Sequence, residues 1–307
     1  MSTKLRFSKK VKEAFKAHRP ILALESTIIA HGMPYPNNIE FAIKAESSCL
    51  EIGVTPATVA IINGEVCVGL ESDELEKIAK GKNIKKISMR ELGLATGLGW
   101  SGATTVSASI TIAQKNKIKV FSTGGIGGVH RGAEHSFDIS QDLVALSKTP
   151  IIVVSSGAKS ILDLHKTIEL LETFGIPTLG YNTTTFPAFY SRSSGVDNVE
   201  MVKSTKEIFD IFNSGHALGL RAATLVTNPI PVNDEIPFDE IKSAMEDAEM
   251  ELEKKGVVGK KATPFLLNQV VKKTEGKSLN ANISLALNNV RLGAEIAKEF
   301  HVQKSTA

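Results

Sequence analysis

The chain has 307 residues, 42% of them hydrophobic and 22% charged, a composition that is ordinary for a folded globular protein and excludes wholesale disorder. Its formal net charge of +3 is too slight to predict a nucleic-acid surface, and no apolar run reaches the roughly 18 residues of a membrane span. Cys49 and Cys67 lie in apolar runs, which is typical of buried thiols in a reducing compartment, so we expect a cytoplasmic protein.

The first 19 residues are basic and poor in acidic residues, which faintly resembles a transit peptide. They lack the serine and arginine richness of such a peptide, and residues 11–17 fit a short surface helix instead. Pro20 to Ala30 then form a buried-strand pattern with a single charge in its middle, Glu25. A carboxylate among apolar residues is either paired or has a raised pKa, and either condition suits a general acid or base. A structural ion pair with an arginine is the alternative.

Asn38 is expected to cap a helix that runs to about Ile52. Further along, Asn63-Gly64 between two apolar segments predicts a β-hairpin. A helix over 73–79 is followed by a short strand with four polar residues, Lys85, Lys86, Ser88 and Arg90. Basic side chains here could neutralise a phosphate or line a charged edge strand. A glycine-rich loop is expected over 93–102, and a tightly packed helix after it.

The stretch from Ile118 to Leu143 combines a short strand, over 118–121, with a dense group of glycines and polar residues. A glycine-rich turn after a strand lets backbone N–H groups approach an anion, although a tight crossover would also explain it. Asp138 and Asp142 are four apart and could share a helical face, while His130 could handle protons or be a structural histidine. The polar residues that follow the turn predict an active-site floor; they are His130, Arg131, Glu134, His135, Asp138 and Asp142.

A buried strand over 151–154 and a Ser-Ser-Gly turn precede a helical pattern from Ala158 to Thr173. Lys159 would then lie in the first turn of this helix, where the positive end of the macrodipole disfavours an ammonium group. An amine with a lowered pKa is what a lysine nucleophile needs. Many exposed lysines also lie near helix starts, so the pattern alone leaves both interpretations open.

The rest of the chain alternates strands and helices and ends in three helices. This rhythm predicts an α/β fold with a central mixed sheet flanked by helices. Without a linker or internal repeat, we expect a single domain over 1–307, with 1–19 as an N-terminal surface helix and extension. The last helix, over 279–300, holds four asparagines that are costly in a helix and indicate binding, or for the first two an exposed helix start; they are Asn280, Asn282, Asn288 and Asn289.

Several blocks of the sequence, taken in order, resemble the pseudouridine-5′-phosphate glycosidase family, also labelled indigoidine synthase A-like. The resemblance covers roughly Ile21 to Ala297 and is carried by blocks such as ALESTIIAHGMPYP, GGIGGVHRGAE, DISQDL, SSGAKSILD, FPAFYSRSSG, TPFLL and SLNANISLALNNV. It implies reversible cleavage of the C–C glycosidic bond of pseudouridine 5′-phosphate to uracil and ribose 5-phosphate. It also implies a homotrimer and one divalent cation per subunit, typically Mn²⁺, with Mg²⁺ as an alternative.

The resemblance also implies roles for particular residues. Lys159 would form a Schiff base with C1′ of the opened ribose, Glu25 would donate a proton, and Asp138 would hold the metal. An iminium at C1′ is the electron sink that breaking this C–C bond requires, and an aspartate suits Mn²⁺ or Mg²⁺ better than zinc. The expected substrate contacts are Lys86, Val106, Ser140, Gln141, Asp142, Asn282 and, as a further candidate, His130.

Two features depart from the family pattern. Residues 88–91 read Ser-Met-Arg-Glu where a basic pair precedes an acid, and Gln141 stands where a small residue is common. Both concern substrate contacts. Two other functional classes fit part of the pattern: a Schiff-base aldolase or lyase acting on another phosphosugar, and a non-catalytic phosphosugar-binding module. The joint presence of Glu25, Asp138 and Lys159 argues against the second of these.

Overall fold

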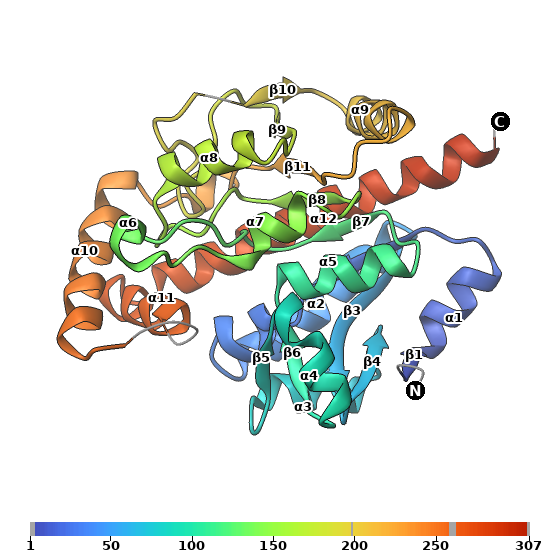
Figure 1. Cartoon of the computed structure of the whole chain (residues 1–307), viewed down its shortest axis with the longest axis horizontal. Coiled ribbons are helices and arrows are strands. Elements are labelled where there is room, and N and C mark those ends of the chain that lie inside the picture. Colours follow the sequence, from blue (N-terminus) through green and yellow to red (C-terminus); the bar gives the residue numbers. More distant parts are fainter. Residues whose placement is uncertain (1–3, 198, 258–261, 306–307) are drawn as a thin grey trace.

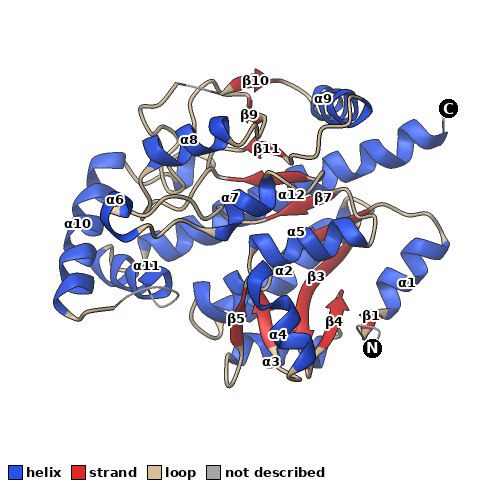
Figure 2. Cartoon of the chain, viewed as in Figure 1, coloured by secondary structure: helices blue, strands red, loops and turns tan. Residues whose placement is uncertain are grey.

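A mixed β-sheet runs through the centre of the molecule in the computed structural model, which describes residues 4–197, 199–257 and 262–305 (Figure 1, Figure 2). The strands are β1 Leu5–Phe7, β2 Ile21–Leu24, β3 Thr55–Ile62, β4 Glu65–Val68, β5 Lys85–Ile87, β6 Gly102–Thr104, β7 Val120–Ser122, β8 Ile152–Ser155, β9 Thr178–Tyr181, β10 Glu200–Val202 and β11 Thr224–Thr227. Their order in the described sheet is β1-β4-β3-β2-β7-β8-β11-β9-β10, and β6 pairs with both β3 and β5. β4 and β6 pair with β3 in antiparallel fashion, whereas the central pairs from β3 through β2, β7, β8 and β11 to β9 are parallel.

Helices cover this sheet, and the long C-terminal helix crosses the whole molecule (Figure 1). The helices are α1 Lys9–Lys16, α2 Asn37–Glu51, α3 Ser72–Lys80, α4 Leu92–Gly97, α5 Val106–Lys115, α6 Ala133–Ser136, α7 Gln141–Leu146, α8 Leu164–Thr173, α9 Thr205–Ala217, α10 Phe238–Lys254, α11 Ala262–Lys273 and α12 Lys277–Ser305. α12 packs against β2, β7 and β8 and against α2, while α5 and α7 form a second packed pair. The predicted α/β fold with a central mixed sheet and flanking helices is therefore confirmed.

The central strands are buried on both faces, as their unbroken apolar sequences indicate. Ile152, Val153 and Val154 of β8 are 0% exposed, as are Leu225 and Val226 of β11. The predicted hairpin is also confirmed, because β3 and β4 pair across a turn whose two central residues both have positive φ, 49° and 78°. Such a turn matches the twist of the strands that it joins.

Two predictions near the N-terminus are wrong in detail. The strand expected over Pro20 to Ala30 ends at Leu24, and Ile28–Gly32 form a π-helical turn that carries the chain away from the sheet. Asn38 does not cap α2, because it lies inside the helix. Its amide instead donates hydrogen bonds to the carbonyls of Ile29 and Ala79, at 2.8 and 2.7 Å, and so ties the π-helical turn to α3.

Two further segments differ from the predictions. α4 occupies much of the region expected as a glycine-rich loop over 93–102. The strand expected over 85–92 ends at Ile87, and a 3-10 turn follows over Met89–Glu91. The helix expected from Ala158 begins only at Leu164, because Asp163 caps it by accepting a hydrogen bond from Lys166 N at 3.0 Å. Lys159 therefore lies in the preceding loop, and the macrodipole argument does not apply to it.

The two cysteines are free thiols and both are buried, as predicted. Burial raises the pKa of Cys49 to about 12 and that of Cys67 to about 11. Among the described residues, no helix is long and apolar enough to cross a membrane.

Candidate active site

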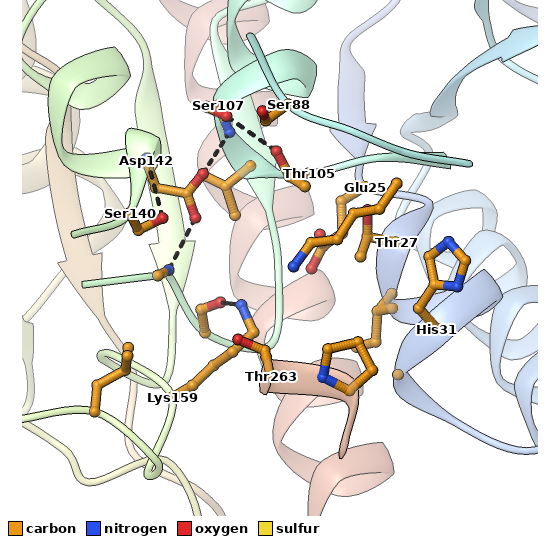
Figure 3. Close-up of a pocket in the computed structure, with 18 of the residues that line it drawn as sticks. Glu25, Thr27, His31, Ser88, Thr105, Ser107, Ser140, Asp142, Lys159 and Thr263 are labelled. Atoms are coloured by element: carbon orange, nitrogen blue, oxygen red, sulfur yellow. Dashed lines mark hydrogen bonds between the residues drawn. The ribbon is translucent and has the colours of Figure 1, made fainter. Parts of the chain in front are cut away.

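A pocket of about 340 Å³ lies where the loops after β2, β7 and β8 meet (Figure 3). These strands are parallel neighbours, so their C-terminal ends share one edge of the sheet, the usual place for a ligand site in an α/β fold. The loop after β2 supplies Glu25, the loop after β7 supplies the glycine turn 124–128, and the loop after β8 supplies Lys159. In Figure 3, Glu25 and His31 lie on one side of the pocket and Ser140 and Asp142 on the other.

All ten residues that the sequence analysis proposed for the site line this single pocket: Glu25, Lys86, Val106, His130, Asp138, Ser140, Gln141, Asp142, Lys159 and Asn282. The rest of the predicted polar floor does not line it. Arg131 forms a salt bridge with Glu249 of α10 at 3.2 Å, and Glu134 forms one with Lys166 of α8 at 2.8 Å. His135 is exposed on α6. These three side chains belong to the surface around the pocket and not to its floor.

Glu25 is 5% exposed, and its Oε1 accepts a hydrogen bond from Thr123 Oγ1 at 2.5 Å. Burial raises the pKa of this carboxyl, while the charge of Lys159 and the Thr123 hydrogen bond act in the opposite direction. A buried carboxyl with a raised pKa holds its proton at higher pH than an exposed one, which suits a general acid. The nearby cations are lysines, so the alternative of an ion pair with arginine is wrong.

Backbone hydrogen bonds fix the position of Lys159, and a carbonyl of the glycine turn fixes the orientation of its side chain. The Lys159 N–H donates to Ile126 O at 3.0 Å, and Ile126 N–H donates to Gly157 O at 3.0 Å, so the loops after β7 and β8 are joined. The Lys159 ammonium group then donates to Gly125 O at 2.6 Å. This arrangement places a primary amine, half-buried, beside the glycine turn.

The carboxylate of Asp142 holds the glycine turn through hydrogen bonds. Its two carboxylate oxygens accept hydrogen bonds from Ser107 N, in the first turn of α5, and from Gly127 N, both at 2.9 Å. A Cβ at Gly127 would lie 2.3 Å from Ser140 Oγ and 2.9 Å from Asp142 Oδ2, so this close approach requires glycine. Asp142 thus links the starts of α5 and α7 to the turn, a role that sequence reasoning missed when it expected only a substrate contact.

Asp138 lies in the loop between α6 and α7, and His130 lies just before α6. The His130 N–H donates to Asp138 O at 3.0 Å. Burial lowers the pKa of His130, the Asp138 charge opposes this, and the charges of Lys86 and Lys159 lower the pKa further. Asp138 precedes the N-cap of α7, so it does not share a helical face with Asp142, contrary to the expectation from their spacing.

The asparagines of α12 divide into different roles. Asn282 is 4% exposed, and its Oδ1 is buried without a hydrogen-bond partner among the described residues, which leaves an acceptor for a ligand. Asn289 is 0% exposed and donates to Thr123 O at 2.9 Å and Gly124 O at 3.2 Å, so it fixes the glycine turn from behind. Asn288 donates to Pro229 O at 3.1 Å.

Several pocket residues were not predicted as site residues. His31 lies in the last part of the π-helical turn; burial lowers its pKa, and its Nε2 lacks a partner among the described residues. Two of these regions could have been predicted, because His31-Gly32 and the TPFLL segment over 263–267 belong to the blocks that carry the family resemblance. The other residues that line the pocket include Thr27, Ser88, Arg90, Thr105, Ser107, Phe189, Thr263, Pro264 and Leu267.

A comparison with protein families matches residues 10–299 to the family described as indigoidine synthase A like protein. The chain belongs to this family. A pseudouridine-5′-phosphate glycosidase from Petrotoga mobilis is 49% identical over 298 residues, which cover 97% of both chains. The protein of the same name from Escherichia coli strain K12 is 48% identical over 297 residues, 96% of this chain and 95% of the relative. The predicted family is confirmed, and with it the expectation of an enzyme of the glycosidase class.

Two solved structures of family relatives have the same fold. The indigoidine synthase A-like protein of Thermotoga maritima has a TM-score of 0.89 and 37% identity, with 97% of each chain covered. The prealnumycin C-glycosynthase AlnA in complex with ribulose 5-phosphate has a TM-score of 0.91 and 34% identity, with 100% of each chain covered. The single α/β domain of this chain is thus that of the indigoidine synthase A-like family.

Proposed function

We propose that this family member reversibly cleaves the C–C glycosidic bond of pseudouridine 5′-phosphate, which gives uracil and ribose 5-phosphate. The observation that carries the proposal is that one pocket brings the amine of Lys159 together with the buried carboxyl of Glu25. Relatives at 48% and 49% identity carry the name of this activity, and a solved neighbour holds a phosphosugar.

The two groups divide the chemistry between them. The neutral amine of Lys159 forms a C–N bond to C1′ while the C1′–O4′ bond opens, and O4′ takes the proton that the lysine nitrogen loses. Glu25 then donates its proton to C5 of uracil. The C1′–C5 bond breaks, its electron pair stays with the uracil ring, and the lysine nitrogen lone pair forms the iminium at C1′. Water hydrolyses this iminium, which releases the sugar aldehyde and returns the amine.

The electrostatics of the pocket favour this assignment. The positive charge of Lys159 lowers the pKa of Glu25, so this effect disappears when Lys159 becomes the neutral nucleophile. Glu25 therefore holds its proton most firmly in the form of the site that is ready to react. A pair of carboxylates alone, as in O-glycosidases, would not stabilise the carbon leaving group.

The remaining pocket residues are proposed to hold the substrate. The ammonium group of Lys86 and the Ser140 hydroxyl suit the phosphate and sugar oxygens, and the unpartnered Oδ1 of Asn282 suits an N–H of the base. Val106, at the start of α5, offers an apolar wall. Gln141 is partly engaged, because its Oε1 accepts a hydrogen bond from Arg90 N at 3.1 Å.

We also propose a divalent cation, Mn²⁺ or Mg²⁺, at Asp138. The described residues contain no group of three or more histidine, cysteine or acidic side chains that could hold a metal. A single carboxylate can hold a hard cation that keeps most of its waters and also binds substrate oxygens. Such an ion would supply positive charge next to the phosphosugar.

The assembly and location of the chain are further proposals. The family resemblance supports a homotrimer, which sedimentation equilibrium tests directly. The two buried free thiols fit a reducing compartment, so we propose the cytoplasm.

The test is uracil release from pseudouridine 5′-phosphate with Mn²⁺, compared between the intact protein and Lys159→Ala, with ribose 5-phosphate followed alongside. We expect release by the intact protein and its collapse in the variant. No release by a folded, metal-loaded protein would overturn the proposal and favour a Schiff-base aldolase. Equal release by both proteins would keep the reaction but remove Lys159 from its chemistry.

A further inference from the structure

A second, much smaller cavity lies next to the active-site pocket and shares three lining residues with it, Glu25, Ile28 and Gly124. Its volume is about 20 Å³, and a cavity of about 10–15 Å³ already accommodates one water molecule. Most of its wall is apolar, from α2, α12 and the strand ends. The polar residues that line it are Glu25, Thr58, Ser122 and Thr123.

Ser122 provides independent evidence for a water molecule there. Its Oγ is buried and has no hydrogen-bond partner among the described residues. Buried hydroxyl groups in native proteins are nearly always hydrogen-bonded, and ordered water commonly provides the bond where protein groups do not. A water in the cavity would give the Ser122 hydroxyl its missing partner.

The sheet register places Thr58 and Ser122 on the same face of the sheet, on either side of Leu24. Leu24, the last residue of β2, pairs with Thr58 of β3 on one side and with Ser122 of β7 on the other. Residues paired in this way project from the same face of a sheet. That face is covered by α12, since a Cβ at Gly293 would lie 3.3 Å from Ser122 Cβ. Thr58 and Ser122 therefore flank the strand end from which Glu25 emerges.

Thr58 connects the small cavity to an acidic side chain nearer the surface. Its Oγ1 donates a hydrogen bond to Oε1 of Glu46, on α2, at 2.8 Å. Glu46 is partly exposed, so it can exchange protons with solvent. Burial raises its pKa, the Thr58 hydrogen bond and Lys10 oppose this, and Glu71 adds to it. The charged groups around Glu25 are those of the site itself: Lys159, Asp142 and Lys86.

We propose that Glu46, Thr58 and a water in this cavity form a proton relay that reprotonates the Glu25 carboxylate between turnovers, by a route separate from the substrate pocket. The relay rests on the proposed function, in which Glu25 gives up one proton for each uracil released. The route through the small cavity stays available while product occupies the active-site pocket.

The transfer balances without any other reactant. Protonated Glu46 passes its proton to the Thr58 oxygen, the Thr58 hydroxyl proton passes to the water, and a water proton passes to the Glu25 carboxylate. Thr58 and the water end with the composition they began with, and Glu46 takes a new proton from solvent. The hydrogen bond between Thr58 Oγ1 and Glu46 Oε1, at 2.8 Å, provides the contact for the first step.

Rapid mixing with pseudouridine 5′-phosphate tests the relay, because it separates the first turnover from the steady state. In Thr58→Val, which removes the hydroxyl at nearly constant volume, we expect an unchanged first release of uracil followed by a steady-state rate at least about tenfold lower. Glu46→Gln should give the same burst, and Thr58→Ser should restore the steady-state rate. Thermal unfolding of each variant checks that the fold is intact.

Three results would overturn the relay. One is an unchanged steady-state rate in Thr58→Val, which would show that Glu25 is reprotonated through the substrate pocket. Another is an equal fall of first and later turnovers, which would show a structural role. The third is a crystal structure of the intact protein with a dry cavity beside Ser122, a result that does not depend on activity. If the intact protein releases no uracil at all, the proposed function fails, and the relay fails with it.

Discussion

The Thr123 hydroxyl donates a hydrogen bond to Glu25 Oε1 at 2.5 Å, between residues that follow two neighbouring strands of the sheet. This bond stabilises the carboxylate form of Glu25, while burial of the same group favours the acid form. The balance leaves the pKa of Glu25 raised, and Thr123 limits how far it rises.

Replacing Thr123 with valine should therefore shift the pH dependence of uracil release. In the proposed mechanism Glu25 acts in its protonated form, so the rate falls as pH rises through its pKa. Loss of the hydroxyl removes an interaction that lowers this pKa, so the pKa should rise. The falling limb of the pH–rate profile, where the rate of uracil release decreases, should therefore move to higher pH. A pH profile of kcat measures it. Thr123→Ser, which keeps a donor, should retain the original limb, and a shift of the valine variant to lower pH would contradict the assignment of Glu25 as the acid.

Gly127→Ala should disable the site without unfolding the chain. The new Cβ would lie 2.3 Å from Ser140 Oγ and 2.9 Å from Asp142 Oδ2, so the glycine turn must move away from the start of α7. A displacement of this size in a catalytic site costs about a hundredfold in rate. Steady-state uracil release checks this. Gly93→Ala on α4 is the matched control, because nothing lies within 4 Å of its added Cβ, and it should stay at the intact rate.

Asn289→Ala should lower the free energy of unfolding by about 3 kcal/mol, because it leaves several buried groups behind the glycine turn without partners. The neighbouring Asn288→Ala loses one hydrogen bond to the Pro229 carbonyl and should cost only about 1 kcal/mol. Urea unfolding of the two variants gives the comparison. Similar losses for both would mean that Asn289 does not hold the turn as its hydrogen bonds indicate.

Asp138→Ala should weaken Mn²⁺ binding by at least about tenfold, because the aspartate is the carboxylate proposed to ligate the ion. Electron paramagnetic resonance of free Mn²⁺ measures this without any reference to activity. Glu134→Gln offers a control on the same segment, since Glu134 pairs with Lys166 outside the pocket. Equal Mn²⁺ binding by intact protein and Asp138→Ala would move the metal to other ligands or exclude it from this loop.

Much of the architecture could be predicted from local patterns. Unbroken apolar runs such as residues 151–154 predict buried strands because they bury both faces of a parallel sheet. Asn63-Gly64 predicts its hairpin because the backbone conformation of the turn is a property of these two residues. The ten proposed site residues were found through the order of the sequence blocks, and all of them line one pocket.

Local patterns failed where a distant partner determines the conformation. Residues 158–162 have a helical period, but they form a loop because the backbone N–H groups of Lys159 and Asp163 donate to carbonyls of Ile126 and Val129, far away in sequence. Asn38 has a good capping side chain, but its amide binds carbonyls of the π-helical turn and of α3.

The sequence by itself determined the α/β class, the family and ten of the residues that line the pocket, because these depend on residue types and their order. Only the tertiary structure decided how those residues act on one another. Asp142 binds the backbone of Ser107 and Gly127, and burial raises the pKa of Glu25 against the opposing charge of Lys159, which is far away in sequence. Hydrogen bonds and desolvation depend on distances in space, and these exist only once the strands have brought their loops to one edge of the sheet.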